Sequence, residues 1–163
     1  MRIMLLAGVL ALTACGSSEE GTVSDEDGVE VGSYAMANGE TTASIRGEDG
    51  SVTSMRSGSQ VAANLPEGFT LADGLTVLNT TNVERGEGRY LMLTMEGSQP
   101  VSDVVSHYRK EALAAGVDVN VDVSTGETTT IAGESKDGLA FSLMASRSGD
   151  KTAVQLTLNQ GLD

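Results

Sequence analysis

The sequence is short of the residues that most often build reactive or metal-binding sites. Its 163 residues include one cysteine, one histidine and no tryptophan, and aromatic residues make up 3%. A single cysteine excludes an intramolecular disulfide. One histidine without further cysteines leaves too few ligands for a transition-metal site, so we expect no metal centre. With so few aromatic side chains, the core must be built from Val, Leu, Ile, Met and Ala.

Positive charge is also scarce. Ten Lys and Arg stand against 23 Asp and Glu, which gives a formal net charge of −13. Binding to nucleic acid needs clustered Lys and Arg against the phosphates, so no nucleic-acid partner is expected. The same imbalance disfavours attachment to anionic lipid surfaces by charge.

The N-terminal stretch has the features of a secretory signal. Arg2 provides a basic start, and an apolar run from Ile3 to Leu12 follows. This run is much shorter than the roughly 20 residues that span a bilayer. The small residue Ala14 directly precedes Cys15. The stretch resembles the signal peptide and lipobox of bacterial lipoproteins, with Leu12-Thr13-Ala14-Cys15 as the lipobox.

The resemblance to bacterial lipoproteins implies a covalent membrane anchor. In that family the cysteine thiol receives a diacylglycerol, the signal peptide (here residues 1–14) is removed, and the new amine is acylated with a fatty acid such as palmitate. Two or more acyl chains hold a protein stably on a membrane. Cys15 is therefore the predicted lipidation site. Gly16 follows it where an aspartate would indicate inner-membrane retention, so the resemblance implies the periplasmic face of the outer membrane.

After the anchor, the sequence predicts a tether and then a hairpin. Residues 15–39 are rich in Gly, Ser and acids, which favours a disordered acidic tether. A flexible chain of about that length reaches roughly 25–30 Å. Residues 40–58 predict a β-hairpin because two weakly apolar segments flank a turn at 47–50.

Residues 64–160 predict an α+β domain, in which one helix packs on an antiparallel sheet. The helix is expected from about Pro100 to Ala115, where Val104, Val105 and Tyr108 recur at helical spacing and Gly116 follows as a cap. Val117–Val123 alternates without interruption and predicts a half-buried strand with four valines on one side. Further strands are expected at 75–78, 89–95, 127–132, 139–146 and 152–158.

Few side chains suggest chemistry. His107 has Asp103 and Glu111 within one helical turn, but a surface histidine is the favoured interpretation. Asp118, Asn120 and Asp122 would line one side of a strand, where their spacing does not match a calcium loop. We expect no catalytic residue, metal or cofactor.

The sequence therefore favours a non-catalytic, membrane-anchored lipoprotein. Its expected partners are the membrane, through the acyl chains on Cys15, and another envelope protein. The alternative is a small-ligand or lipid-binding module with a pocket between helix and sheet, for which four side chains are candidates: Met92, Met95, Tyr108 and Met144. A hydrolase that uses two carboxylates is a weaker alternative.

Overall fold

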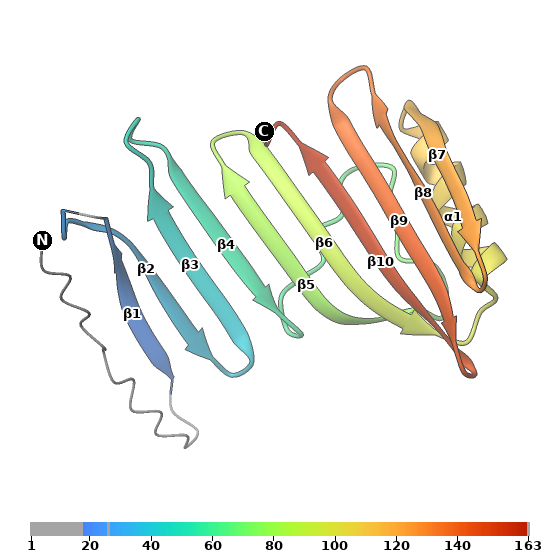
Figure 1. Ribbon diagram of the computed structural model, residues 1–163, viewed down its shortest axis with the longest axis horizontal. Helices are drawn as coiled ribbons and strands as arrows, with labels where there is room; N and C mark the ends of the chain where they lie inside the picture. The colour runs from blue at the N-terminus through green and yellow to red at the C-terminus, as the bar shows by residue number, and fades with distance from the viewer. Residues whose placement is uncertain (1–17, 26, 163) are drawn as a thin grey trace, which may run out of the picture.

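The computed structural model describes residues 18–25 and 27–162. These residues form one antiparallel ten-stranded sheet and one helix (Figure 1). The helix is α1 (Val101–Ala114). The strands are β1 (Glu19–Ser24), β2 (Glu30–Ala37), β3 (Glu40–Arg46), β4 (Val52–Gly58), β5 (Thr76–Arg85), β6 (Gly88–Gly97), β7 (Val117–Thr125), β8 (Thr128–Ser135), β9 (Leu139–Ser148) and β10 (Lys151–Gln160).

The order of the strands is that of two meanders joined by the helix. Strands β1 to β6 follow one another, α1 then carries the chain to the opposite edge, and β7 to β10 return until β10 pairs with β6. Short turns make the neighbours antiparallel. The predicted antiparallel sheet with one packed helix is confirmed, although strands dominate the fold.

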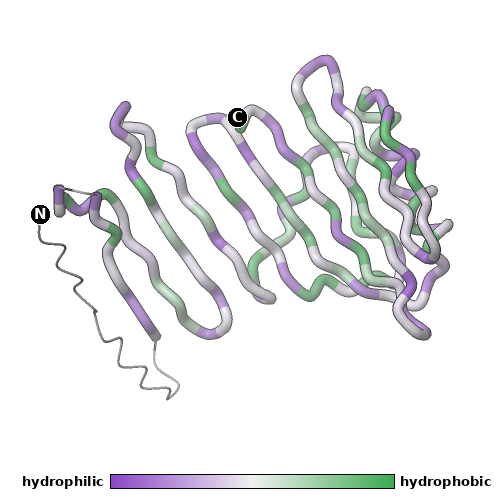
Figure 2. Tube along the Cα trace, in the orientation of Figure 1, coloured by the Kyte–Doolittle hydropathy of each residue, from purple (hydrophilic) through white to green (hydrophobic). Residues whose placement is uncertain are grey.

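One side of the sheet, which we call the helix side, carries the core. There α1 packs on β7, β8 and β9. The connection between β4 and β5 crosses the same side (Figure 1), where Phe69 stacks on Phe141 with ring centroids 5.9 Å apart. Figure 2 shows hydrophobic segments along β6, β10 and β9 and around α1. The opposite side, which we call the bare side, has no helix on it in the described part of the chain.

The helix agrees with its prediction. Pro100 directly precedes it, and Gly116 follows with a φ of 80°, a conformation that glycine adopts without strain. The predicted apolar stripe is buried against the sheet by Val104, Val105, Tyr108 and Ala112. Local spacing and capping residues were therefore sufficient to locate this element.

Strand β7 differs from its prediction. Its pairing with β8 shifts between Val119 and Val121, so Asn120 is the extra residue of a β-bulge. The valines beyond the bulge consequently face the bare side, where Val121 and Val123 are 40% and 55% exposed, while Val117 is buried on the helix side. The expected single row of four valines is wrong.

The expected disordered tether is also wrong for the part of 15–39 that the structure describes. Residues 19–24 and 30–37 are the strands β1 and β2, which pair with one another, and β2 continues the pairing to β3. The physical reason is the two-residue turn Asn38-Gly39, whose φ angles of 54° and 77° favour a tight hairpin. Backbone pairing then propagates outward from β3 despite the acidic composition.

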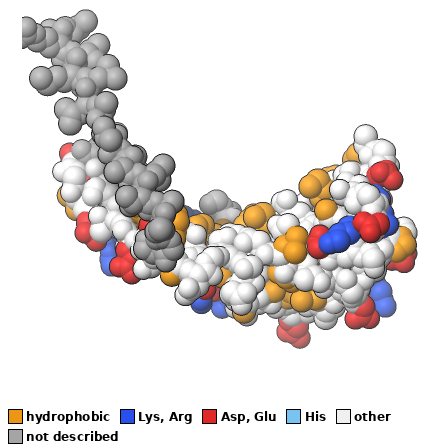
Figure 3. All heavy atoms as spheres, turned by 90° about the horizontal axis from the view of Figure 1, so that it is seen from below, with side chains coloured by type: hydrophobic (Ala, Val, Ile, Leu, Met, Phe, Trp, Pro, Cys, Tyr) orange, Lys and Arg blue, Asp and Glu red, His pale blue; other side chains and the backbone are white. Residues whose placement is uncertain are grey.

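The predicted hairpin at 40–58 is confirmed as β3 and β4. It does not stand apart, because β4 pairs with β5 from Thr53 to Gly58 and so joins the hairpin to the rest of the sheet. Seen edge-on in Figure 3, the described residues form a curved slab.

Candidate functional site

Strands β1 to β4, which we call the uncovered strands, form a single layer. Helix α1 contacts β7, β8 and β9, at the other end of the sheet. Gly58, the last residue of β4, is the one buried residue of these four strands. Among residues 18–25 and 27–162, nothing covers either side of this layer, unlike the strands beneath α1.

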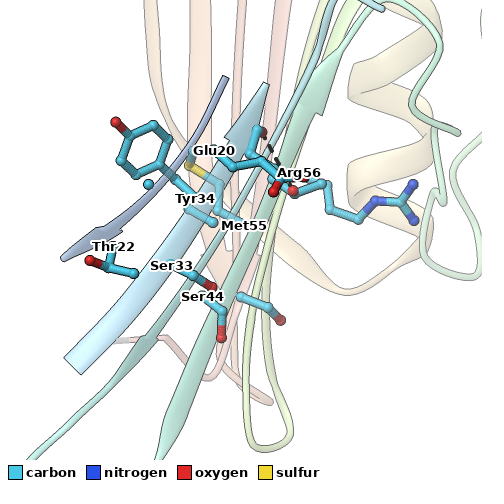
Figure 4. A pocket seen from close by; sticks show the side chains of 12 residues that line it. Glu20, Thr22, Ser33, Tyr34, Ser44, Met55 and Arg56 are labelled. Atoms are coloured by element: carbon cyan, nitrogen blue, oxygen red, sulfur yellow. Dashed lines mark hydrogen bonds between the residues drawn. The ribbon is translucent and has the colours of Figure 1, made fainter. Parts of the chain in front are cut away.

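The helix side of the uncovered strands carries a row of hydroxyl groups. Direct pairings across four strands align the hydroxyls of Thr22, Ser33, Ser44 and Ser54. They line a shallow groove of about 650 Å³. At one end of this groove Arg56 donates hydrogen bonds of 3.0 and 2.7 Å to Oε1 of Glu40. Figure 4 shows Arg56 extending away from Tyr34 and Met55, which lie on the bare side.

The bare side of the same strands is more apolar. Tyr34, Met36 and Ile45 are 37%, 45% and 46% exposed. Tyr34 lies across Gly21 of β1, because a Cβ atom at Gly21 would lie 2.5 Å from the tyrosine ring. Because Gly21 has no side chain, the Tyr34 ring can lie over its backbone at the edge of the sheet.

This end of the molecule is strongly acidic. Between residues 18 and 45 the sequence has seven Asp and Glu and neither Lys nor Arg. Of these, Glu19, Glu20, Asp25, Asp27 and Glu30 are exposed. Asp25 also closes the turn between β1 and β2, since its Oδ1 accepts hydrogen bonds of 3.0 and 2.9 Å from the backbone N–H groups of Asp27 and Val29.

His107 is partnered by Glu111, one of the two acids predicted to be near it. Its Nε2 lies 3.2 Å from Oε1 of Glu111 and 3.4 Å from the Thr70 hydroxyl. A catalytic relay would need the hydroxyl and the carboxylate on different ring nitrogens. Here both face the same nitrogen, and the Thr70 hydroxyl donates directly to Glu111 at 2.6 Å. Asp103 instead accepts a 3.2 Å hydrogen bond from Ser102.

The bulge in β7 separates the three polar residues predicted on its surface. Asp122 lies on the helix side and accepts a 2.8 Å hydrogen bond from Arg109 of α1. Asp118 lies on the bare side, directly opposite Glu134 of β8 in the strand register. Among residues 18–25 and 27–162, no three His, Cys, Asp or Glu side chains are grouped so that they could hold a metal ion.

The four candidates for a pocket between helix and sheet lie on two sides of the sheet. Tyr108 and Met95 are fully buried in the core, where the Tyr108 hydroxyl lies 3.7 Å from the Met95 sulfur. Met92 and Met144 lie on the bare side, where Met92 is opposite Thr157 of β10 and Met144 is opposite Gln155. The methionines therefore do not line one common cavity.

A small cavity does exist at another place on the helix side. It has a volume of about 320 Å³ and lies between the Asn64–Pro66 segment and the ends of β5, β6 and β10. Leu91 and Leu158 line it but are already 95% or more buried, at 5% and 3% exposure. Half-buried Leu65, Pro66 and Leu139 add to its apolar lining, and Arg89 is its basic group.

The predicted signal peptide and Cys15 lie outside the described residues. Across the part that is described, none of the helical structure is long and apolar enough to cross a membrane.

Comparison with known proteins gives no relative. No family, no curated protein and no solved structure matches this chain.

Proposed function

We propose that this protein is a lipid-anchored, periplasm-facing binding module of the outer membrane, with no catalytic role. The proposal combines the lipobox ending at Cys15 with the single-layer architecture of β1 to β4. The observation that carries the binding role is that these strands expose both sides and apolar residues, and that no other element of the described residues covers them. An enzyme would need reactive groups that converge in a cleft, whereas a binding module needs accessible surface.

The short distance between anchor and sheet limits where a partner can be. Glu19, the first residue of β1, is the fourth residue after Cys15. An extended chain covers at most about 3.6 Å per residue, so the sheet begins within roughly 14 Å of the lipidated residue. This is about half the reach expected for a disordered tether. The partner is therefore an envelope protein that is itself close to the membrane surface.

Two experiments test the proposal. A Cys15→Ser variant should lose its acyl chains, by mass spectrometry of the purified protein, and leave the membrane fraction. If it still sediments with membranes like the wild type, the anchoring part of the proposal is wrong.

The binding part is tested by crosslinking in intact cells. A photoreactive residue at Met36 or Ile45, both exposed on the uncovered strands, should give a discrete adduct with an envelope protein. The matched control is Leu113, which is 56% exposed on α1 and should give no such adduct. Equal adducts from Leu113, or none from the strands, would contradict the assignment.

A second candidate function is the binding of a small ligand. The 320 Å³ cavity near Arg89 favours it, since its size lies at the lower end of ligand pockets. Filling the cavity with a Leu65→Phe variant should abolish ligand binding while leaving the crosslinks from Met36 intact.

A further inference from the structure

Among the residues that the structure describes, strand β1 has a neighbour on one side only. It pairs with β2 from Glu19 to Ser24, and it ends the sheet order. In a strand, alternate residues direct both their N–H and C=O groups to the same side. None of the outward backbone groups of β1 has a hydrogen-bond partner in the described part of the chain. An edge of this kind can accept an additional strand.

The other edge strand is less suitable. The bulge at Asn120 interrupts β7, and bulges of this kind protect a sheet edge from further pairing. Asp122 is also tied to Arg109 across the face of this strand, at 2.8 Å. Of the two edges, β1 is therefore the better template for strand addition, although its pairing with β2 also shifts at its end, between Val23 and Ser24.

The side chains around β1 indicate which strand would bind. Glu19 and Glu20 point to opposite sides of the sheet, as successive residues of a strand do, and both are exposed. The Tyr34 ring lies over Gly21 at the same margin and is 37% exposed. Carboxylates attract Lys and Arg, and an exposed tyrosine ring attracts the same cations through its face. The Lys or Arg residues of an added strand would therefore meet a carboxylate whichever side of the sheet they face.

Charge also disfavours the simplest alternative, a second copy of this chain. Two copies joined at β1 would bring together two segments with seven acids and no basic residue each. Like charges at a shared edge oppose pairing. We propose that the edge of β1 binds, by strand addition, an extended basic segment with Lys or Arg at alternate positions. This inference deepens the proposed function and rests on it for the location of the partner.

The test uses the mature lipidated chain in detergent and a labelled seven-residue peptide in which Lys and Val alternate. Fluorescence anisotropy at low salt should show saturable binding. An otherwise identical peptide with N-methylated backbone amides keeps every charge but cannot pair with an edge. We expect it to bind at least tenfold more weakly. A peptide in which Glu replaces Lys should not bind.

Two charge-reversal variants locate the peptide on the chain. Glu19→Lys/Glu20→Lys should weaken binding at least tenfold, whereas Asp118→Lys/Glu134→Lys, an exposed cross-strand pair near the opposite edge, should not. The N-methylated peptide leaves the protein unchanged, so the test does not depend on the folding of a variant.

Several outcomes would overturn the strand-addition inference. These are no binding of the basic peptide, equal binding of its N-methylated form, equal loss in both charge-reversed variants, or a dimer that forms through β1 in the absence of peptide. If any of these occurs while crosslinks from Met36 persist, the inference fails and the proposed function stands. Loss of both would reject the binding role itself.

Discussion

The Thr70 hydroxyl donates a 2.6 Å hydrogen bond to Oε1 of Glu111, while the Thr70 backbone N–H donates to Oε2 at 3.2 Å. One carboxylate on α1 thus holds the connection between β4 and β5 at two points. Phe69, directly before Thr70, and Ala72, two residues after it, are buried in the core. We therefore interpret the contacts among Thr70, His107 and Glu111 as a structural contact that holds the connection against the helix.

The first prediction concerns how much this contact contributes to the free energy of unfolding. Glu111→Ala removes a carboxylate that is 15% exposed and leaves two donors of Thr70 without it. Hydrogen bonds to charged groups contribute roughly 1.5–3 kcal/mol, so we expect the free energy of unfolding to fall by about 2 kcal/mol. Urea unfolding measures the change, and Lys110→Ala, an exposed neighbour on α1, is the control.

A double-mutant cycle with Thr70→Val separates the contact from other effects of the Glu111 substitution. The two substitutions together should cost clearly less than the sum of their separate costs. Additive costs would show that Thr70 and Glu111 do not stabilise one another.

The second prediction concerns alkaline pH. Burial raises the pKa of Tyr108 above its ordinary value of 10.0, and the nearby charge of Glu111 acts in the same direction, while the Ala72 N–H opposes it. The folded state thus keeps this proton at a pH where the unfolded state releases it. The stabilisation is complete below about pH 10 and is lost as the pH rises through the folded-state pKa.

We therefore expect the free energy of unfolding to fall above pH 10, and to fall less steeply in a Tyr108→Phe variant. The phenolate absorbance of the wild type minus that of the variant isolates the titration of Tyr108. A difference titration centred at or below pH 10 would contradict the raised pKa.

The comparison of sequence with structure shows where local signals suffice. The spacing of Val104, Val105 and Tyr108, with Pro100 before and Gly116 after, located α1 because these features act within one or two turns of a helix. The strand pattern from 88 to 160 was similarly clear. The bulge at Asn120 was not visible, because alternation along one strand contains no information about the register of its neighbour.

The prediction of disorder for the acidic N-terminal region was wrong for a different reason. Composition indicated disorder, although the Asn38-Gly39 pair is a strong hairpin signal that lies inside the same region. For the candidate site, the missing information was tertiary. That Tyr34 covers Gly21 follows from the register between β1 and β2, and that Met92 and Met144 share the bare side follows from their pairing with β10, which the alternation along a single strand does not contain.

The third prediction concerns Gly133, which lies opposite Val119 beside the bulge. A Cβ atom there would overlap the backbone carbonyl of Asp118, which cannot rotate away as a side chain could. Gly133→Ala should cost about 1–3 kcal/mol, as overpacking generally does. Hydrogen exchange should show faster opening of β7 than in an Ala132→Ser control. Unchanged protection of β7 would mean that the bulge accommodates the methyl group.

The fourth prediction concerns Arg147, whose guanidinium joins the turn after β9 to the segment that leads into α1. Its Nε and Nη2 donate to the carbonyls of Gly149 and Asp150 at 3.1 and 2.8 Å. Its Nη1 lies 3.4 Å from the carbonyls of Ser98 and Gln99. The planar fork of arginine reaches all of these acceptors at once, whereas a lysine presents its donors from a single nitrogen.

We expect Arg147→Lys to lower the free energy of unfolding by about 1–2 kcal/mol, and Arg147→Ala by more, because the half-buried carbonyl of Gln99 and three exposed carbonyls then lose this donor. Thermal unfolding of the mature chain measures both. The control is Lys151→Ala, which breaks an exposed pair with Glu96 and should have a small effect. A lysine variant as stable as the wild type would show that positive charge alone, rather than the geometry of the guanidinium, holds this segment in place.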